Sequence, residues 1–196
     1  MATNVLVIPE DFRKDQYVLK PIVERMMASI GVKAKVVICK DPLLGGVGEA
    51  LKWALIEEIV ERYKGMIRIF ILVVDRDCNK SRRRALDGLE DKAARLLADE
   101  RKRFFAENAW QELEVWVLAG QTDLPKKWAW KDVLDECDPK EAYYDEYAKR
   151  RGVLQAAYEG REQLGREAAS NYQRIRELCR KDVRRLEERI AAALAE

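Results

Sequence analysis

Carboxylates follow two of the most apolar runs in the chain, and they are the residues best suited to chemistry. Asp75 and Asp77 come directly after residues 69–74, and Glu10 comes directly after residues 5–9. Side chains alternate along an extended segment, so the two aspartates can lie on one side of it. If both runs are parallel strands, their carboxyl ends meet at one sheet edge, where ligands bind in such folds. The sequence therefore predicts three acids at that edge.

A divalent metal ion is the predicted ligand of these acids. Two carboxylates about 5 Å apart repel by roughly 3 kcal/mol at an effective dielectric of about 20, so the group persists only if protons or a cation neutralise it. A donor set made only of oxygen selects Mg²⁺ or Mn²⁺ and leaves positions open for phosphate oxygens. The alternative is that the aspartates only cap a loop or helix. Glu112 and Glu114 lie near the start of a further predicted strand, so their place at this edge is less secure.

Basic residues come shortly after the two aspartates, at the start of a predicted helix. They are Lys80, Arg82, Arg83 and Arg84. Their position favours contact with phosphate groups near the metal, and a solvated helix face is the equally weighted alternative. The glycine-rich segment at residues 43–48 fits neither the Walker nor the dinucleotide pattern, and a simple turn is favoured there.

The composition excludes several classes of chemistry. The chain has no histidine, which rules out a Ser-His-Asp or Cys-His triad, a histidine-ligated zinc and an imidazole base. Its four cysteines, widely spaced and without a CxxC motif, are expected to be reduced thiols of an intracellular protein. We see no signal peptide and no apolar run long enough for a bilayer, which predicts a cytoplasmic protein without a membrane partner. The net charge of +2 argues neither for nor against nucleic acid.

Two periodicities alternate over the first 120 residues and predict the elements that position these acids. Strands are expected at residues 5–9, 34–39, 68–74 and 113–119, with helices between them. Pro21 indicates that the first helix begins near Lys20 or kinks there, and a charged helix is expected over residues 81–106. Such alternation predicts right-handed βαβ units and an α/β fold with a mostly parallel, four-stranded sheet flanked by helices.

A change of composition after Gly120 divides the chain into an α/β domain, residues 1–120, and an α-helical C-terminal extension, residues 121–196. Residues 121–137 are expected to form a loop with a short aromatic segment, and Asp138 to start helices that run to the end. An apolar stripe from Tyr172 to Ala193 could pack on the α/β domain or on a second copy of the chain. Packing within the chain is favoured, although self-association or a protein partner stays open.

The order of these motifs resembles that of Toprim domains, which occur in topoisomerases, primases, OLD-type nucleases and small bacterial defence proteins such as the RloB-like ones. Glu10 matches the glutamate of the first motif, and Asp75 and Asp77 match the DxD in VVDRD. The segment ELEVWVLAG is similar to the FE-x-W-x-L strand of the RloB-like proteins, which places Glu114 at their acid. The resemblance covers residues 4–120.

This resemblance implies a Toprim-like fold and Mg²⁺-dependent cleavage of a phosphodiester. The DxD aspartates would hold the metal with Glu114, and Glu10 would act as a general base or as a ligand of a second metal. A nuclease acting on DNA or RNA, plausibly in antiphage defence, is the function expected. The sequence departs from the family where Asp11 replaces the usual glycine after Glu10 and where Asp15 lies one residue further on.

Two other functions compete with this expectation. One is a catalytically weak adaptor with a Toprim-shaped body that binds a protein partner through its C-terminal helices. The other is a receiver-like domain that accepts a phosphoryl group at Asp75. A receiver requires a fifth strand with a lysine, which the sequence lacks before its composition changes, so it ranks below the others.

Overall fold

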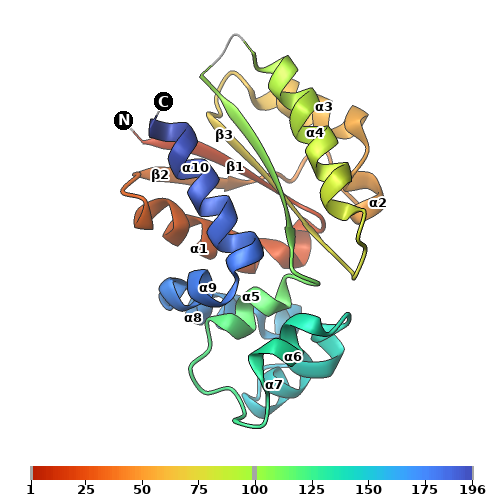
Figure 1. Cartoon of the computed structure of the whole chain (residues 1–196), viewed down its shortest axis with the longest axis vertical. Helices are drawn as coiled ribbons and strands as arrows, with labels where there is room; N and C mark the ends of the chain where they lie inside the picture. The colour runs from red at the N-terminus through yellow and green to blue at the C-terminus, as the bar shows by residue number, and fades with distance from the viewer. Residues whose placement is uncertain (1, 99–100, 196) are drawn as a thin grey trace.

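The computed structural model describes residues 2–98 and 101–195. Within them, four strands form one parallel sheet in the order β2-β1-β3-β4, as Figure 1 shows. The strands are β1 (Thr3–Pro9), β2 (Ala34–Ile38), β3 (Ile69–Asp75) and β4 (Arg103–Ala109). The α/β fold with a helix-flanked parallel sheet and C-terminal helices is therefore confirmed. The register aligns Pro9 with Val73 and Asp75 with Ala109, so the segments after β1, β3 and β4 leave the sheet at the same edge.

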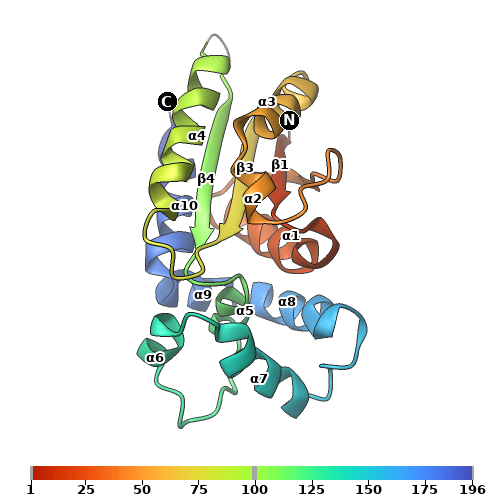
Figure 2. The same ribbon diagram turned by 90° about the vertical axis from the view of Figure 1, so that its right-hand side faces the viewer.

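Helices cover both faces of this sheet (Figures 1 and 2). They include α1 (Phe12–Ser29) on one face, and α3 (Trp53–Tyr63) and α4 (Arg82–Leu96) on the other, with the short α2 (Val47–Ala50) before α3. Alternate residues of β3 enter different cores: Ile69 and Ile71 pack with α1, whereas Phe70 and Leu72 pack with α3 and α4. The continuous apolar run in β3 thus reflects burial on both faces.

Helix α1 begins at Phe12 and not near the predicted Lys20. Asp11 is its N-cap, and the Asp11 carboxylate accepts the backbone N–H of Arg13 at 3.0 Å. This cap gives Asp11 a structural role at the start of α1. Pro21 lies inside the helix, which is continuous through it.

The fourth strand was predicted in the wrong place. It is β4, at Arg103–Ala109, and the run predicted as a strand at residues 113–119 forms helix α5 (Glu114–Ala119) instead. Likewise α4 ends at Leu96 and does not reach residue 106. Every residue of α5 is buried and all except Glu114 are apolar, so the sequence of this helix resembles that of a buried strand.

The C-terminal helices pack on the sheet and beyond its carboxyl edge (Figure 2). They are α6 (Trp130–Asp135), the π-helix η1 (Lys140–Tyr144), α7 (Asp145–Arg150), the 3₁₀ turn η2 (Ala157–Gly160), α8 (Arg161–Ser170), α9 (Tyr172–Leu178), the π-helix η3 (Arg180–Arg184) and α10 (Arg185–Ala195). Ile175, Leu186 and Ile190 are fully buried in the core that also contains α1 and the strands. The apolar stripe therefore packs within the chain, and this core spans both sides of residue 120.

Two glycines allow α8 to approach its neighbours closely. A Cβ atom on Gly165 would lie 2.4 Å from the carbonyl oxygen of Tyr17 in α1, and one on Gly120 would lie 2.4 Å from the Cα of Ala168. Pro21, four residues after Tyr17, has no N–H with which to bond that carbonyl. These contacts fix α8 against both α1 and the end of α5. Across residues 2–98 and 101–195, no helix is long and apolar enough to cross a membrane.

Candidate functional site at the carboxyl edge of the sheet

Six carboxylates gather at the carboxyl edge of the sheet, and we call them the acidic cluster. They are Glu10, Asp15, Asp75, Asp77, Glu112 and Glu114. They follow β1, β3 and β4, because the corrected position of β4 places Glu112 and Glu114 after its carboxyl end. The four predicted acids are thus brought together, and the sequence reasoning had not counted Asp15 and Glu112 as site residues.

Asp75 is at the centre of the acidic cluster. Its Oδ1 accepts the backbone N–H of Leu113 at 2.8 Å, and its own N–H donates to Oε2 of Glu10 at 3.2 Å. Burial raises the pKa of Asp75 well above its usual range, and the charges of Glu114 and Glu10 raise it further. Burial and the neighbouring carboxylates therefore both disfavour the ionised form of Asp75.

The pKa values of other carboxylates in the acidic cluster are also raised, which disfavours their ionised forms. Burial raises the pKa of Asp15 to about 7, although its carboxylate accepts the N–H of Asp11 at 3.0 Å. Burial likewise raises the pKa of Glu112 to about 7, against the opposing hydrogen bond from the N–H of Lys140 at 2.8 Å. The pKa of Glu10 is raised for the same reason. Near neutral pH the acidic cluster therefore holds protons that isolated carboxylates would have lost.

Two arginines contact the acidic cluster in the part of the chain that the structure describes. Nη2 of Arg82 lies 3.1 Å from Oδ2 of Asp77, and the buried Arg161 pairs directly with Glu114. If all six acids were ionised, these two cations would leave an excess of negative charge. The partners Arg161 and Glu114 are 47 residues apart, so no local pattern in the sequence could have predicted their pairing.

The turn that carries the DxD motif is fixed by Gln111. Asp77 and Cys78 have left-handed backbone angles, with φ of 49° and 52°. The carbonyl oxygen of Gln111 accepts the N–H of Arg76 at 2.8 Å and that of Asp77 at 3.0 Å, and its side-chain oxygen accepts the N–H of Cys78 at 2.9 Å. The loop after β4 thereby sets the position of the aspartates after β3.

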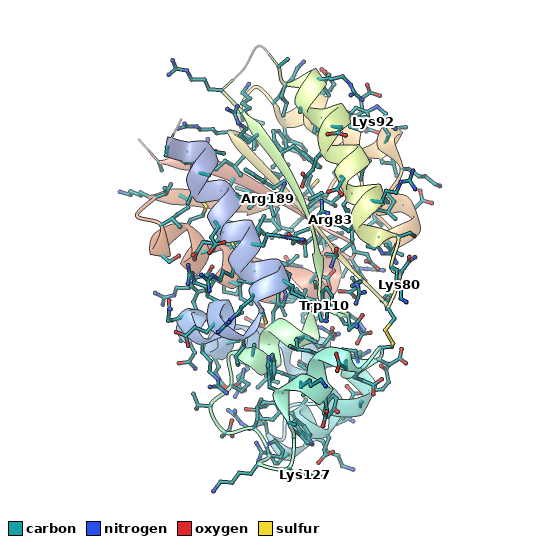
Figure 3. The ribbon with its side chains drawn as sticks, viewed as in Figure 1. Lys80, Arg83, Lys92, Trp110, Lys127 and Arg189 are labelled. Carbon is teal, nitrogen blue, oxygen red and sulfur yellow. A yellow bond between two sulfur atoms is a disulfide. The ribbon has the colours of Figure 1, made fainter. Side chains whose placement is uncertain are left out.

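A disulfide joins this turn to the helical extension. Cys78 is bonded to Cys137, with Cα atoms 5.4 Å apart, and the bond is visible beside Lys80 in Figure 3. Cys39 and Cys179 are free and buried. The expectation of four reduced thiols is therefore wrong for two of them, because the fold brings together cysteines that are 59 residues apart. Disulfides are rare in reducing compartments, and the cytoplasmic location stays a prediction.

The four predicted phosphate-binding residues do not share one surface. Lys80 and Arg84 are exposed, whereas Arg82 is buried and paired with Asp77. Arg83 turns toward β4, where its Nη1 donates to the carbonyl oxygen of Ala106 at 2.8 Å. Arg82 and Arg83 therefore serve carboxylates and backbone groups of the chain itself.

A second buried group of charges lies along β4, and we call it the β4-edge cluster. Glu107 is fully buried and is surrounded by Arg83 at 3.3 Å, Arg185 at 3.1 Å and Arg189 at 4.0 Å. Glu90 binds Arg189 at 2.5 Å and Arg83 at 3.4 Å, and it also accepts the N–H of Ala106. Figure 3 shows Arg83 and Arg189 approaching each other between α4 and α10. The exposed Asp87 also binds Arg83, at 2.7 Å, so three carboxylates meet three guanidinium groups here.

The chemistry of the acidic cluster fits a hard cation, although a complete ligand set is not assembled. All its donors are carboxylate oxygens, the ligands that Mg²⁺ and Mn²⁺ prefer. Over the described ranges, no group of three or more Asp, Glu, Cys or His side chains is arranged to hold a metal ion. Two of the predicted ligands, Asp77 and Glu114, instead bind arginines.

Comparison with known proteins gave no match to a family model, to a curated protein or to a solved structure. The Toprim relationship therefore stays a prediction, and the functional argument rests on the geometry of the acidic cluster.

Proposed function

We propose that the acidic cluster is a divalent-cation site for cleavage of phosphodiesters, as in a Toprim-like nuclease. The observation that carries this proposal is the environment of Asp75, a largely buried carboxyl whose strongest electrostatic neighbours are other carboxylates. Burying like charges together is costly unless protons or a cation neutralise them. A hard cation from solution would remove that cost.

The roles follow from where each carboxylate lies. Asp75 and Glu10, which are linked by a hydrogen bond and have no arginine partner described, would hold Mg²⁺ or Mn²⁺, and Asp77 and Glu114 would join them on release from their arginines. When bound, the ion would polarise a phosphoryl oxygen and lower the pKa of a bound water. Burial raises the pKa of Glu10 above its usual value, which makes this carboxylate a better proton acceptor and suits a general base.

A cationic aromatic patch at the same edge supports nucleic acid as the substrate. The guanidinium of Arg76, between the two aspartates of the DxD motif, lies 4.0 Å from the ring centre of Trp110. Nζ of Lys181 lies 4.1 Å from the same ring, which Figure 3 shows just beyond the end of β4. Cations beside an aromatic ring are suited to contact with phosphates and bases.

Thermal unfolding with and without Mg²⁺ or Mn²⁺ tests the cation site. Binding at a hundredfold excess over Kd stabilises a fold by about 2.7 kcal/mol, so the wild type should melt at a higher temperature with metal. Asp75→Asn should lose that gain, whereas Glu167→Gln, remote from the cluster and paired with Arg151, should keep it. Cleavage of labelled DNA and RNA by the wild type and by Asp75→Asn then tests the chemistry. If neither metal raises the melting temperature of the wild type, the proposal is contradicted.

A catalytically weak adaptor is the second candidate, and the arginines on Asp77 and Glu114 favour it. Removing residues 139–196 is not a clean test of that role, because Ile175 and Ile190 belong to the main core. An adaptor should instead retain its biological activity in Asp75→Asn. A receiver is disfavoured, since the strands of the described residues number four and a receiver needs a fifth.

A further inference from the structure

Three cations converge on one carboxylate, Glu159, beside the acidic cluster. Nζ of Lys14 lies 3.1 Å from it and Nζ of Lys140 lies 3.6 Å from it, while Arg161 hydrogen bonds to it directly. These cations come from α1, η1 and α8, and we call them the cationic triad. One carboxylate cannot neutralise three cations. Arg161 also binds Glu114 and the charge of Lys14 also acts on Asp11, but Glu159 is the carboxylate within ion-pair distance of both lysines.

The cationic triad is partly buried and favours an anion strongly. Arg161 is 5% exposed, and the side chains of Lys140 and Glu159 are 25% and 30% exposed. Burial opposes the charge of Glu159, but Arg161, Lys14 and Lys140 outweigh it and lower its pKa to about 2. Glu159 therefore stays ionised at any physiological pH.

Glu159 reaches the triad on a backbone turn that is unfavourable for its residue types. Tyr158, Glu159 and Gly160 are all left-handed, with φ of 58°, 56° and 75°. This conformation is unfavourable for residues other than glycine, because the Cβ atom lies too close to the following carbonyl oxygen. Stacking of Tyr158 on Tyr17, with ring centres 4.3 Å apart, helps to hold the turn. Loss of the Glu159 contacts would let this turn relax and would uncover the cations.

The triad borders the acidic cluster on several sides. Arg161 links the two, since the same guanidinium binds Glu159 and Glu114. The backbone N–H of Lys140 donates to Glu112 at 2.8 Å, and Lys14 directly precedes Asp15 in α1. An anion on the triad would therefore lie next to the proposed cation site.

We propose that the cationic triad is a binding site for a phosphate group of the substrate and that Glu159 occupies it as an internal stand-in anion. A phosphate offers more oxygen acceptors than a carboxylate and a charge that matches three donors better. Its assignment to the substrate rests on the proposed function of the acidic cluster, whereas the capacity to bind phosphate does not. The ligand of this site would be a phosphorylated or phosphodiester-linked molecule. On binding, its phosphate would displace the carboxylate of Glu159 from the triad.

Binding of inorganic phosphate in the presence of EDTA tests the site without any metal. The full chain is titrated with phosphate and binding is followed by calorimetry. Glu159→Gln should bind phosphate about tenfold or more tightly than the wild type, since it frees the triad. Glu167→Gln, which breaks a similarly exposed ion pair with Arg151 at 2.9 Å, is the matched control and should show no gain.

Two further variants make the outcome decisive. Adding Lys14→Gln and Lys140→Gln to Glu159→Gln should abolish the gain. Glu159→Asp, which keeps the charge but shortens the side chain, should give a smaller gain and serves if Glu159→Gln fails to fold. No gain in either Glu159 variant, or a gain that survives loss of both lysines, overturns the inference. Phosphate binding without any Mg²⁺ response would instead support the site and count against the proposed function alone.

Discussion

Two regions of this molecule bury carboxylates, and they treat the charge in opposite ways. In the β4-edge cluster, Glu107 and Glu90 are enclosed by Arg83, Arg185 and Arg189. In the acidic cluster, six carboxylates meet two arginines among the described residues. In the β4-edge cluster the arginines of the chain balance the carboxylates. In the acidic cluster the carboxylates outnumber the arginines that contact them.

The pKa directions express the same difference. Burial raises the pKa of Glu107, and the nearby Arg185 and Arg83 oppose the rise. Burial also raises the pKa of Asp75, and there the neighbouring carboxylates add to the rise. A buried acid that its own fold neutralises is structural. One that the fold leaves unneutralised indicates a ligand from outside, which is why the acidic cluster carries the proposed function.

Glu107→Gln should have the largest effect on stability. It leaves three arginines with two carboxylates, Glu90 and the exposed Asp87, and breaking a buried ion pair in this way costs about 3–5 kcal/mol. Urea unfolding should show a lower midpoint with an unchanged slope. Glu188→Gln, in the exposed pair of Glu188 in α10 with Arg184 in η3, is the control and should cost less than about 1 kcal/mol. Equal losses in both variants would remove the contrast between the two regions.

Loss of the Cys78–Cys137 disulfide should have the next largest effect on stability. The bond holds the turn that carries Asp77, so its loss should also loosen this part of the acidic cluster. The closed loop spans 59 residues, for which the chain-entropy model gives about 4 kcal/mol. Replacing both cysteines with serine, or reducing the bond with a dithiol, should lower the free energy of unfolding. The Cys39→Ser variant keeps the disulfide, because Cys39 is free, and it is the control for reduction. A dithiol should lower its free energy of unfolding by the same amount as that of the wild type. Unaltered stability of the double variant would show that the bond does not form in solution.

The stability of the wild type should fall as pH rises from about 5 to 8 without metal. The pKa values of Asp15 and Glu112, about 7 in the folded state, exceed their usual values near 4, so the folded state binds more protons in this window. The free energy of unfolding then decreases as these protons are lost, on the order of 2–3 kcal/mol for each of the two groups. Melting temperatures measured across this range should show the fall, and Mg²⁺ should reduce it. A rise in stability over the same window would contradict the raised pKa values.

Asp75→Asn should have the smallest effect and the opposite sign to Glu107→Gln. It removes a charge from a repulsive group, and the amide oxygen can still accept the N–H of Leu113. At pH 8 without metal the variant should be more stable than the wild type by about 1–2 kcal/mol. Chemical unfolding at pH 8 measures the difference, and a loss of stability would mean that the Asp75 charge is compensated after all.

The first three strands and the acids at their ends could be predicted from the sequence. The predicted runs at residues 5–9, 34–39 and 68–74 correspond to β1, β2 and β3 almost residue for residue. Burial on both faces makes such strands continuously apolar, and the register then brings Glu10 and Asp75 to one edge. Local pattern and topology were sufficient for this part of the site.

The fourth strand and the partners of the acids could not be predicted in the same way. The strand RFFAENA contains Glu107, and this buried charge is tolerated only because Arg185 and Arg189 arrive from α10. The apolar run after it is as long as a strand, and length alone could not distinguish it from the buried helix α5. Arg161, Glu159 and the Cys78–Cys137 bond depend likewise on contacts between distant segments.

The position of α10 also sets the order in which this fold can be completed as the chain is synthesised. Leu186 and Ile190 of α10 belong to the core on the face of the sheet that carries Ile71 and Phe105. Helix α1 can cover the part of this face near Ile71 early, but the part near Phe105 stays uncovered until α10 has been synthesised. Until then the chain exposes apolar side chains of β4, a surface of the kind that makes folding intermediates prone to aggregate.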